Sequence, residues 1–479
     1  MREILERALN TAQLLGAGYV DARLVATDEE SIRTRNGAVR AVQRSQTTGL
    51  GVRVLVDGAW GFAGTSSADL KGAESAARSA VEIAKASASL KHRAVDLGTP
   101  VVHRATYVTP HQKDPLSVSL EDKVALLLAA DAAMEMPKVA VRQASLVSLR
   151  RKQVFASSEG SYIEQEIVEA GGGLEALAVD QGEVQQRSYP NSFGRNQATA
   201  GYEFVESMDL VGQAPRVAEE AVMLLTAPLC PEEETTVILG PTQLALQVHE
   251  SCGHPTELDR ALGSEAAYAG TSFLMPDMLG DFRYGSDIVN LVADATVPGG
   301  LGTFGYDDEG VPAQCSYLVR DGVFVGYLMS RETAATLGMA SNGAMRASGW
   351  DRIPLVRMTN INLEPGDWAF DDLLADSDGA LYLEMNKSWS IDDKRLNFQF
   401  GTEVAYRVEG GRLGTLYRNA VYTGITPRFW GDCDAICNRD HWAMWGTANC
   451  GKGQPGQVAH VGHGVAPARF RRVQVRPGT

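Results

Sequence analysis

The sequence predicts an α+β fold, in which small N-terminal α/β modules with antiparallel sheet are followed by a sheet-rich C-terminal domain. Two observations lead to this prediction. The 479 residues exceed what a single hydrophobic core usually holds, so two or three domains are expected. Helix-like and strand-like patterns are mixed in the first half of the chain, whereas short strand-like runs and glycine-rich connections dominate the second half.

The first module is predicted over residues 1–92. Apolar residues recur at helical spacing over 3–15, which predicts a helix. Alternating apolar and polar residues, punctuated by Asn-Gly and Asp-Gly turns, then predict an antiparallel meander with strands at 19–26, 30–35, 38–44 and 50–56. An alanine-rich helix over 69–88 completes the module.

The middle module is predicted over residues 116–228. It follows an aperiodic stretch at 94–116, which we interpret as a linker. A helix over 120–134 comes first, and a second antiparallel set of strands follows over 139–205. An amphipathic helix near 211–226 ends the module.

The C-terminal domain is predicted over residues 234–479. A β-branched run at 235–239 leads to a helix, and Gly240 and Pro241 separate the two elements. The apolar residues expected to anchor this helix in the core are Leu244, Ala245, Val248 and Cys252. The rest of the domain is expected to be mostly sheet, with strand-like runs at 315–320, 323–329, 380–386, 396–407 and 414–422.

Composition excludes several classes of protein. A net charge of −15 and a pI near 5.1 argue against a dedicated nucleic-acid surface or anionic-membrane surface. No run of about 18 apolar residues predicts a membrane span, and the first residues carry acidic side chains where a secretory signal would be apolar. We therefore expect a cytoplasmic protein. Six cysteines in so long a chain do not indicate a disulfide scaffold.

Two histidines and a glutamate lie between His249 and His254, in a chain with only eight histidines. Histidines that share a metal on a regular helix are usually four residues apart. A spacing of five turns them about 140° apart on an α-helix, so the backbone must widen or break between them. Gly253 supplies conformational freedom there, and Pro255 prevents an ordinary continuation of the helix. The C-terminal domain is thus predicted to carry a metal-site helix.

A catalytic zinc usually takes three protein ligands, so a third must come from elsewhere in the chain. Cys450 is one candidate, in a glycine-rich stretch that we interpret as a flexible loop. Spacing alone leaves the choice open. The other candidates are the array Cys433, Cys437 and His441, which could also hold a second metal, and the two single residues His460 and His463.

Glu250 is the predicted general base. It adjoins a candidate ligand, and a carboxylate in that position can take a proton from a water that the metal acidifies. Asp259 and Arg260 lie just beyond the motif and could orient His254 or a substrate. We expect them more simply to be charges on a helix surface.

Three stretches resemble the TldD/PmbA family of metallopeptidases, and the resemblance spans nearly the whole chain. Residues 31–37 and 51–63 are similar to the amino-terminal module of that family. Its H-E-x-x-x-H motif stands here as His249, Glu250 and His254. The carboxy-terminal signature is similar to residues 449–454, 463–464 and 467–470.

The resemblance implies a zinc site made by His249, His254 and Cys450, with one Zn²⁺ per active site. Some family members, of the TldE/PmbA type, lack these ligands, so this chain is similar to the metal-bearing TldD type. Family members act on unfolded peptides or peptide precursors, bound as an extended strand. They form homodimers or heterodimers with a metal-less TldE/PmbA-like chain. Strand addition reads backbone and therefore tolerates varied side chains.

The main hypothesis is a cytoplasmic zinc-dependent peptidase with Glu250 as general base, which could trim peptides from an end or cut them internally. The alternative is a non-hydrolytic peptide-binding or regulatory partner with a structural zinc. An open coordination position and chelator-sensitive cleavage would separate the two. A thiol redox role for Cys433 and Cys437 is less favoured, because they do not form a C-x-x-C motif.

Overall fold

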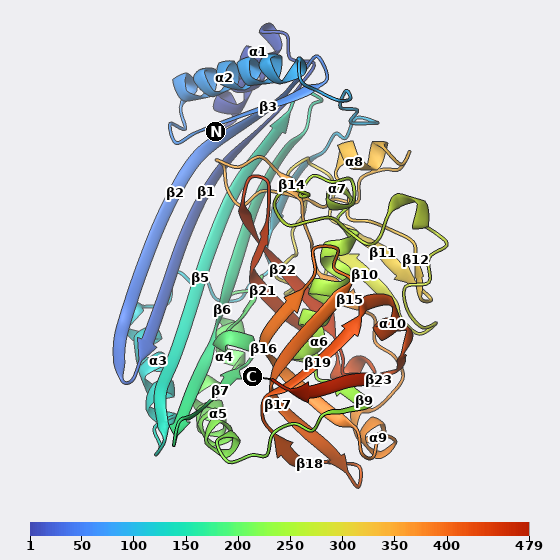
Figure 1. Ribbon diagram of the computed structural model, residues 1–479. Coiled ribbons are helices and arrows are strands. Elements are labelled where there is room, and N and C mark those ends of the chain that lie inside the picture. Colours follow the sequence, from blue (N-terminus) through green and yellow to red (C-terminus); the bar gives the residue numbers. More distant parts are fainter. Residues whose placement is uncertain (479) are drawn as a thin grey trace.

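A curved sheet of long strands forms one side of the protein in the computed structural model, which describes residues 1–478 (Figure 1). The strand order is β3-β2-β1-β5-β6-β4, and β7 and β8 also pair with β6. The strands are β1 (Tyr19–Arg35), β2 (Ala38–Val56), β3 (Ala59–Thr65), β4 (Arg104–Val108), β5 (Val139–Ser157), β6 (Tyr162–Asp180), β7 (Glu183–Tyr189) and β8 (Asn196–Ala198).

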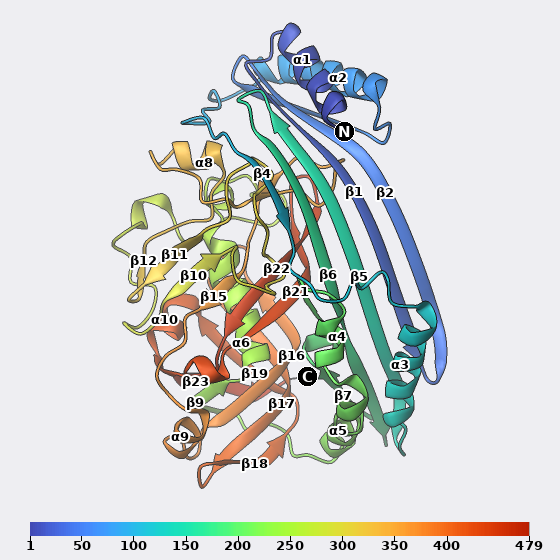
Figure 2. The same ribbon diagram turned by 180° about the vertical axis from the view of Figure 1, so that it is seen from behind.

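Helices cover the two ends of this sheet (Figure 2). At one end lie α1 (Arg2–Leu14) and α2 (Leu70–Ala88), and at the other lie α3 (Leu120–Ala133), α4 (Glu203–Ser207) and α5 (Leu210–Leu224). The predicted helices of both N-terminal modules are confirmed to within two residues at each end. Small residues let α2 pack closely against β3. α2 offers alanines, and β3 offers Gly61, where a Cβ would lie 2.0 Å from the carbonyl oxygen of Ala80.

The four short strands predicted in the first module are two long ones, β1 and β2, which pair continuously from Tyr19↔Leu55 to Arg35↔Ala38. The prediction of four was wrong because polar residues interrupt the alternation. Thr27 and Glu29 line a cavity, so they are polar without ending the strand.

The predicted linker contains a strand. β4 pairs in parallel with β6, from Arg104↔Tyr162 to Val108↔Glu166. Its five residues give too short a pattern to stand out in the sequence. Strands from both N-terminal modules therefore share one sheet, and the proposed division at 92 and 116 stays a prediction.

A second sheet forms the base of the C-terminal domain. Its order is β16-β9-β23-β19-β17-β18, with β20 on β23, and β16 also pairs with β17, so that the sheet closes on itself. These strands are β9 (Glu233–Leu239), β16 (Leu381–Ile391), β17 (Asn397–Glu409), β18 (Arg412–Tyr417), β19 (Ala420–Ile425), β20 (Cys433–Ile436) and β23 (Ala468–Pro477).

Smaller sheets and short helices complete the domain. The remaining strands are β10 (Leu291–Asp294), β11 (Cys315–Arg320), β12 (Val323–Phe324), β13 (Met345–Arg346), β14 (Leu355–Val356), β15 (Ile361–Leu363), β21 (Ala443–Lys452) and β22 (Gln457–Val465). The helices are α6 (Pro241–Val248), α7 (Leu258–Ala261), α8 (Arg331–Ala335), α9 (Phe370–Ala375) and α10 (Thr426–Gly431). None of the helices within residues 1–478 is long and apolar enough to cross a bilayer.

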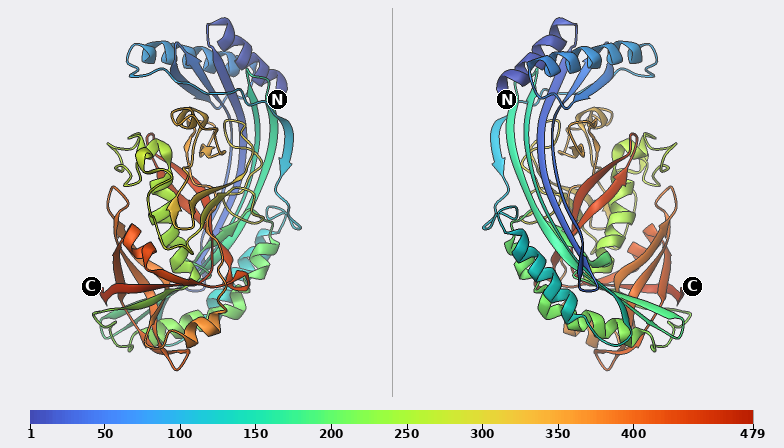
Figure 3. Two further views of the ribbon diagram at one scale, coloured as in Figure 1. Left: turned by 90° about the vertical axis from the view of Figure 1, so that its right-hand side faces the viewer. Right: turned by 90° about the vertical axis from the view of Figure 1, so that its left-hand side faces the viewer.

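The hairpin of β21 and β22 lies between the long sheet and the rest of the C-terminal domain (Figure 3). It contacts β8 on one side and α6 and β15 on the other. The predicted anchor residues of the metal-site helix all belong to the main buried core, which confirms that α6 is fixed on rigid structure. The hairpin and α6 together hold the candidate site.

Candidate metal centre

The helix that carries the two histidines widens where they lie. α6 ends at Val248, and a π-helical turn, His249–Gly253, is followed by a 3₁₀ turn, His254–Thr256. The backbone N–H of His254 donates to the carbonyl of His249, five residues earlier. Such a bond widens the turn and brings residues five apart to the same side. The predicted distortion between the histidines is confirmed.

Gly253 serves this turn for a reason other than the expected one. Its φ of −57° is ordinary for a right-handed helix, so glycine is not needed for backbone freedom. A Cβ at this position would lie only 2.2 Å from the Sδ of Met358. Glycine therefore lets the buried Met358 side chain pack directly against the turn.

Three side chains converge at the widened turn. His249, His254 and Cys450 are all buried, and each places one possible ligand atom within 4.8 Å of the others. The two imidazole rings stand at 87° to each other, with their centres 4.9 Å apart. Nε2 of His254 lies 3.7 Å from Sγ of Cys450. Two imidazoles and a thiol suit zinc or a similar transition metal.

His463 on β22 orients the ring of His249. Its Nε2 lies 2.8 Å from Nδ1 of His249, and its own Nδ1 lies 3.2 Å from the carbonyl oxygen of Ile361. A carbonyl only accepts, so Nδ1 of His463 is the donor and Nε2 the acceptor. His249 then donates from Nδ1, and its Nε2 faces the site. Burial lowers the pKa of this imidazole, but the neighbouring Cys450 outweighs burial and raises it, so a metal that binds there takes the place of a proton. Burial and the neighbouring His249 hold the pKa of His463 well below its usual value, which keeps the ring neutral.

Glu257 orients the second histidine. Its Oε2 lies 3.1 Å from Nδ1 of His254, and the glutamate is fully buried. Donation from Nδ1 leaves Nε2 of His254 free on the side of Cys450. Burial lowers the pKa of His254 to about 4, so the ring is in the neutral form that binds metal. Carboxylates commonly orient metal-binding histidines in this way.

Cys450 lies on a strand and not in the flexible loop expected from its glycine-rich surroundings. It belongs to β21, is paired with β22, and is 3% exposed. The loop interpretation was wrong because long-range contacts fix the segment. Arg357 donates to the Cys450 carbonyl at 2.5 Å, and Lys452 donates to Asp259 at 2.7 Å and lies 3.4 Å from Glu257. The hairpin is thus tied to the residues that follow His254.

The charges around Cys450 favour its thiolate. Burial alone would raise the pKa of this thiol, but His249, His254 and Arg357 outweigh burial and hold the pKa well below its usual value. The thiolate is the form that binds metal. With both imidazoles oriented through Nδ1, the residues present fit a metal ion held by two nitrogens and one sulfur.

Glu250 lines the same cavity as the three converging residues. Its Oε2 accepts a hydrogen bond from Nη1 of Arg395 at 2.5 Å, and Arg395 lies in the connection between β16 and β17. Burial raises the pKa of Glu250, but the two histidines and Arg395 outweigh it and lower the pKa. The carboxylate is therefore ionised at neutral pH.

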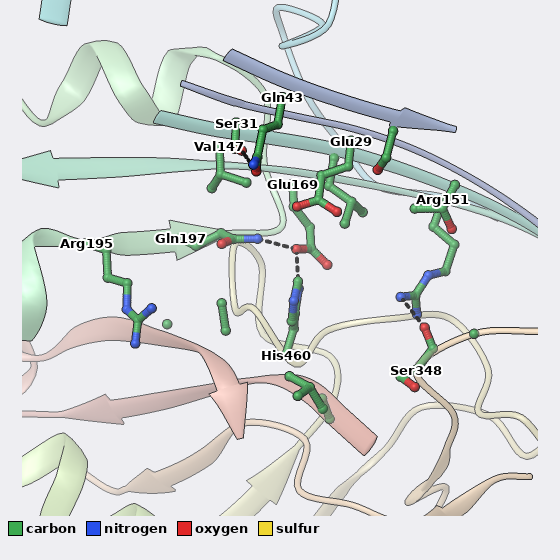
Figure 4. Close-up of a pocket in the computed structure, with 18 of the residues that line it drawn as sticks. Glu29, Ser31, Gln43, Val147, Arg151, Glu169, Arg195, Gln197, Ser348 and His460 are labelled. Carbon is green, nitrogen blue, oxygen red and sulfur yellow. Dashed lines mark hydrogen bonds and ion pairs between the residues drawn. The ribbon is translucent and has the colours of Figure 1, made fainter. Parts of the chain in front are cut away.

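Two cavities meet at this centre. The smaller, of about 260 Å³, is lined by the converging residues, by Glu250 and by the aromatic pair Phe193 and Trp389, both more than a third exposed. The larger, of about 700 Å³, lies between the long sheet and the C-terminal domain, and Figure 4 shows residues that line it. Arg195 and Gly446 line both, so the cavities are adjacent.

The other candidates lie elsewhere. Within residues 1–478, Cys433, Cys437 and His441 form no set of converging ligand atoms. Both cysteines are buried, burial raises their pKa values, and Nε2 of His441 accepts from the backbone N–H of Phe370. Cys433 is on β20, Cys437 follows that strand directly, and His441 ends the 3₁₀ turn Arg439–His441.

His460 bonds to Glu169 of the long sheet at 2.6 Å, away from the centre. The expectation that Asp259 and Arg260 are surface charges was wrong, since both are buried and Arg260 pairs with Glu265 at 3.0 Å. Lys452 of β21 donates to Asp259, and Arg260 donates to the carbonyls of Thr271 and Asp393. Nothing next to the motif in the sequence indicates these contacts. Sequence reasoning also missed Glu257 and Arg395. The i,i+3 spacing of Glu257 after His254 was a usable signal, whereas Arg395 gave none.

The fold and site define a class of α+β protein with a buried group of two histidines and a cysteine that could hold a metal, beside a glutamate and a cavity that adjoins a larger one. The chain matches the PmbA/TldA metallopeptidase domain 1 over residues 20–84 and the central domain over 113–227. It matches the C-terminal domain of the same metallopeptidases over 232–476. The chain therefore belongs to the PmbA/TldD family.

Relatives and solved structures agree. Metalloprotease MJ0996 of Methanocaldococcus jannaschii is 29% identical over 454 residues, which cover 94% of this chain and 96% of that protein. A zinc metalloprotease TldD homolog of Saccharolobus solfataricus is 26% identical over 194 residues, or 40% of this chain and 41% of that one. TldE of Thermococcus kodakarensis has a similar structure, with a TM-score of 0.76 and 16% identity over 99% of this chain and 100% of that one. The predicted fold class is confirmed.

Proposed function

We propose that the protein is a zinc-dependent peptidase that hydrolyses unfolded peptides or peptide precursors. The convergence of His249, His254 and Cys450 beside Glu250, in a cavity that adjoins a larger one, carries the proposal. The names of two relatives, a metalloprotease and a zinc metalloprotease, favour hydrolysis over a purely structural metal.

One zinc ion per chain would be held by Nε2 of His249, Nε2 of His254 and Sγ of Cys450. The bound ion would supply Lewis acidity, which lowers the pKa of a coordinated water toward about 7 and polarises a carbonyl group. Three protein ligands are the number found at catalytic zinc sites, where one position stays open. His463 and Glu257 support this arrangement by occupying Nδ1 of each imidazole.

Glu250 acts as the general base. Its carboxylate is ionised and lines the cavity, and Arg395 holds Oε2 in place. Among residues 1–478 no hydrogen bond occupies Oε1, which is therefore the oxygen that takes a proton from the attacking water. Glu250 then returns the proton to the leaving amine of the cleaved peptide bond.

The peptide substrate binds as an extended strand in the larger cavity. Short polar side chains of β1, β2 and β5 line its wall, and they include Thr27, Ser31, Gln43, Ser45, Thr47 and Ser145. Such a wall makes few demands on side chains, which suits backbone recognition of varied sequences. We place this activity in the cytoplasm, in peptide maturation, and in a homodimer or a heterodimer with a metal-less TldE/PmbA-like chain. Likeness to TldE supports the dimer proposal.

Digestion of a mixed pool of unfolded peptides tests the proposal. The chain is purified alone, analysed for zinc and incubated with the pool, and the products are identified by mass spectrometry. Wild type should cleave, a chelator should abolish cleavage, and Glu250→Ala should keep zinc but lose at least about 100-fold in rate. Wild-type rates in Glu250→Ala would remove Glu250 from the role of base. Bound zinc without any cleavage would favour the peptide-binding or regulatory alternative.

A further inference from the structure

A second arginine faces the metal centre from the connection between β7 and β8, residues 191–195, which we call the arginine strap. Arg195 at its end lines both the small cavity at the centre and the large one beside it. Within residues 1–478 its guanidinium makes no hydrogen bond and no ion pair. Its guanidinium carbon lies 5.8 Å from the centre of the Phe193 ring, in the same strap.

The arginine strap is anchored on both sides of Arg195. The hydroxyl of Ser192 accepts a hydrogen bond at 3.0 Å from the backbone N–H of Asn386 on β16. The side-chain oxygen of Asn196 accepts one at 2.8 Å from the backbone N–H of Gly446 on β21. The backbone that carries Arg195 is therefore held in place between the two sheets, as in a preorganised binding site.

Several other charged groups along the large cavity have partners; within residues 1–478 Glu29 and Arg33 have none, but both are exposed and neither lines the small cavity. Glu169 accepts from His460 and from Gln197, each at 2.6 Å, and Arg151 donates to the carbonyl of Ser348 at 3.2 Å. Figure 4 shows these pairs joined and Arg195 apart from them. Arg195 is exposed at the mouth of the cavities, and the part of its surface that the protein covers lowers its pKa, with no carboxylate in the described chain to offset this. An accessible guanidinium without a partner in the protein is available to bind an incoming anion.

The charges at the small cavity point the same way. Arg395 is neutralised by Glu250, so Arg195 is the cation there that remains for a ligand. The aromatic pair Phe193 and Trp389 lies beside it and offers an apolar wall to a neighbouring side chain. A ligand that fits combines a carboxylate with an adjacent apolar group, which is the chemistry of a peptide segment.

We propose that Arg195 binds a carboxylate of the peptide substrate, so that the protein prefers peptides with a negative charge close to the scissile bond. This inference rests on the proposed peptidase function. The planar guanidinium can hold a carboxylate by two parallel hydrogen bonds. The carboxylate is either the free C-terminus of the peptide or an acidic side chain, and both present the same two oxygens.

Matched peptides test this subsite. A peptide that the wild type cleaves is made with a free C-terminus, with an amidated C-terminus, and in amidated form with one aspartate at successive positions. kcat/KM is measured for wild type, Arg195→Gln and Arg195→Lys. Arg40→Gln is the control, since Arg40 is exposed and lines neither cavity. Arg195→Gln should lose about 10- to 100-fold on carboxylate-bearing peptides and less than about threefold on the amidated, uncharged one. Arg195→Lys should recover part of the loss, and Arg40→Gln should show no such selectivity.

Each outcome decides the proposal. If kcat/KM of Arg195→Gln falls only for the peptide with a free C-terminus, the α-carboxylate is the ligand. If it falls only for a peptide with aspartate at one position, the ligand is that side chain. Equal loss on charged and uncharged peptides, with zinc content and Tm as in wild type, overturns the proposal. Binding of the same peptides to Glu250→Gln, measured by fluorescence anisotropy, separates recognition of the carboxylate from catalysis. Carboxylate-selective binding without any cleavage would overturn the peptidase function alone, and binding without selectivity would overturn the subsite.

Discussion

Replacement of His463 by alanine should weaken zinc binding although His463 is not a ligand in our proposal. Its ring is 1% exposed and its Nε2 lies 2.8 Å from Nδ1 of His249. Removal of the ring leaves the Nδ1–H of His249 buried without a partner. The proton can then move to Nε2, which is the nitrogen that must be free for metal.

The expected loss follows from the cost of that buried donor. An unsatisfied buried polar group costs about 1–3 kcal/mol. Since about 1.4 kcal/mol is tenfold in an equilibrium constant, the Kd for zinc should rise about 5- to 150-fold. This range overlaps the effect of about 10- to 100-fold that is typical when the partner of a metal-binding histidine is removed.

Competition with a chromophoric chelator gives the Kd for zinc. His463→Gln should recover part of the affinity, because its amide oxygen can accept from His249. His460→Ala is the matched control, since His460 lies on the same strand but bonds to Glu169. An unchanged Kd in His463→Ala, or equal weakening in His460→Ala, would refute the role given to His463.

Three further changes test other parts of the structure. Gly253→Ala should lower the free energy of unfolding in urea by about 1–3 kcal/mol, because its Cβ would lie 2.2 Å from the Sδ of Met358; unchanged stability would contradict this packing. Lys452→Met should cost about 3–5 kcal/mol in the same assay and reduce zinc content, because it removes the cation that two buried carboxylates share. Burial raises the pKa of Glu169, but His460 outweighs it, so the folded pKa lies below the unfolded value of about 4.3. The stabilisation by Glu169 is thus complete above about pH 4.3 and is lost as the pH falls through the folded pKa. The stability difference between wild type and Glu169→Gln should therefore shrink in acid, and a constant difference would contradict the pairing.

Local patterns predicted several helices of the fold and the widened turn that carries two of the candidate ligands. Helical periodicity located α1, α2, α3 and α5, because each buries one face against a sheet. The five-residue spacing of His249 and His254 predicted a widened turn, because α-helical geometry would separate their side chains. These inferences hold because their causes lie within a few residues of each other.

Long-range contacts account for what the sequence did not predict. Cys450 is held by Arg357 and by the buried Lys452, so a glycine-rich segment forms a strand. Arg395 meets Glu250 across 145 residues of sequence, and no local pattern indicates that pair. Polar residues within the long strand β1, such as Thr27, face a cavity. They interrupt the apolar alternation, so the pattern did not reveal the full length of the strand. In each case the partner that fixes the residue is distant in sequence.

X-ray absorption at the zinc edge tests the central claim most directly, because it counts the atoms bound to the metal. The wild-type chain, purified alone, should contain one zinc. Its ligands should be one sulfur at about 2.3 Å, two imidazole nitrogens at about 2.0–2.1 Å and one oxygen. Cys450→Ser should lose the sulfur contribution, whereas Cys433→Ser should keep it. A shell with several sulfurs, or with none, would contradict a centre built by His249, His254 and Cys450.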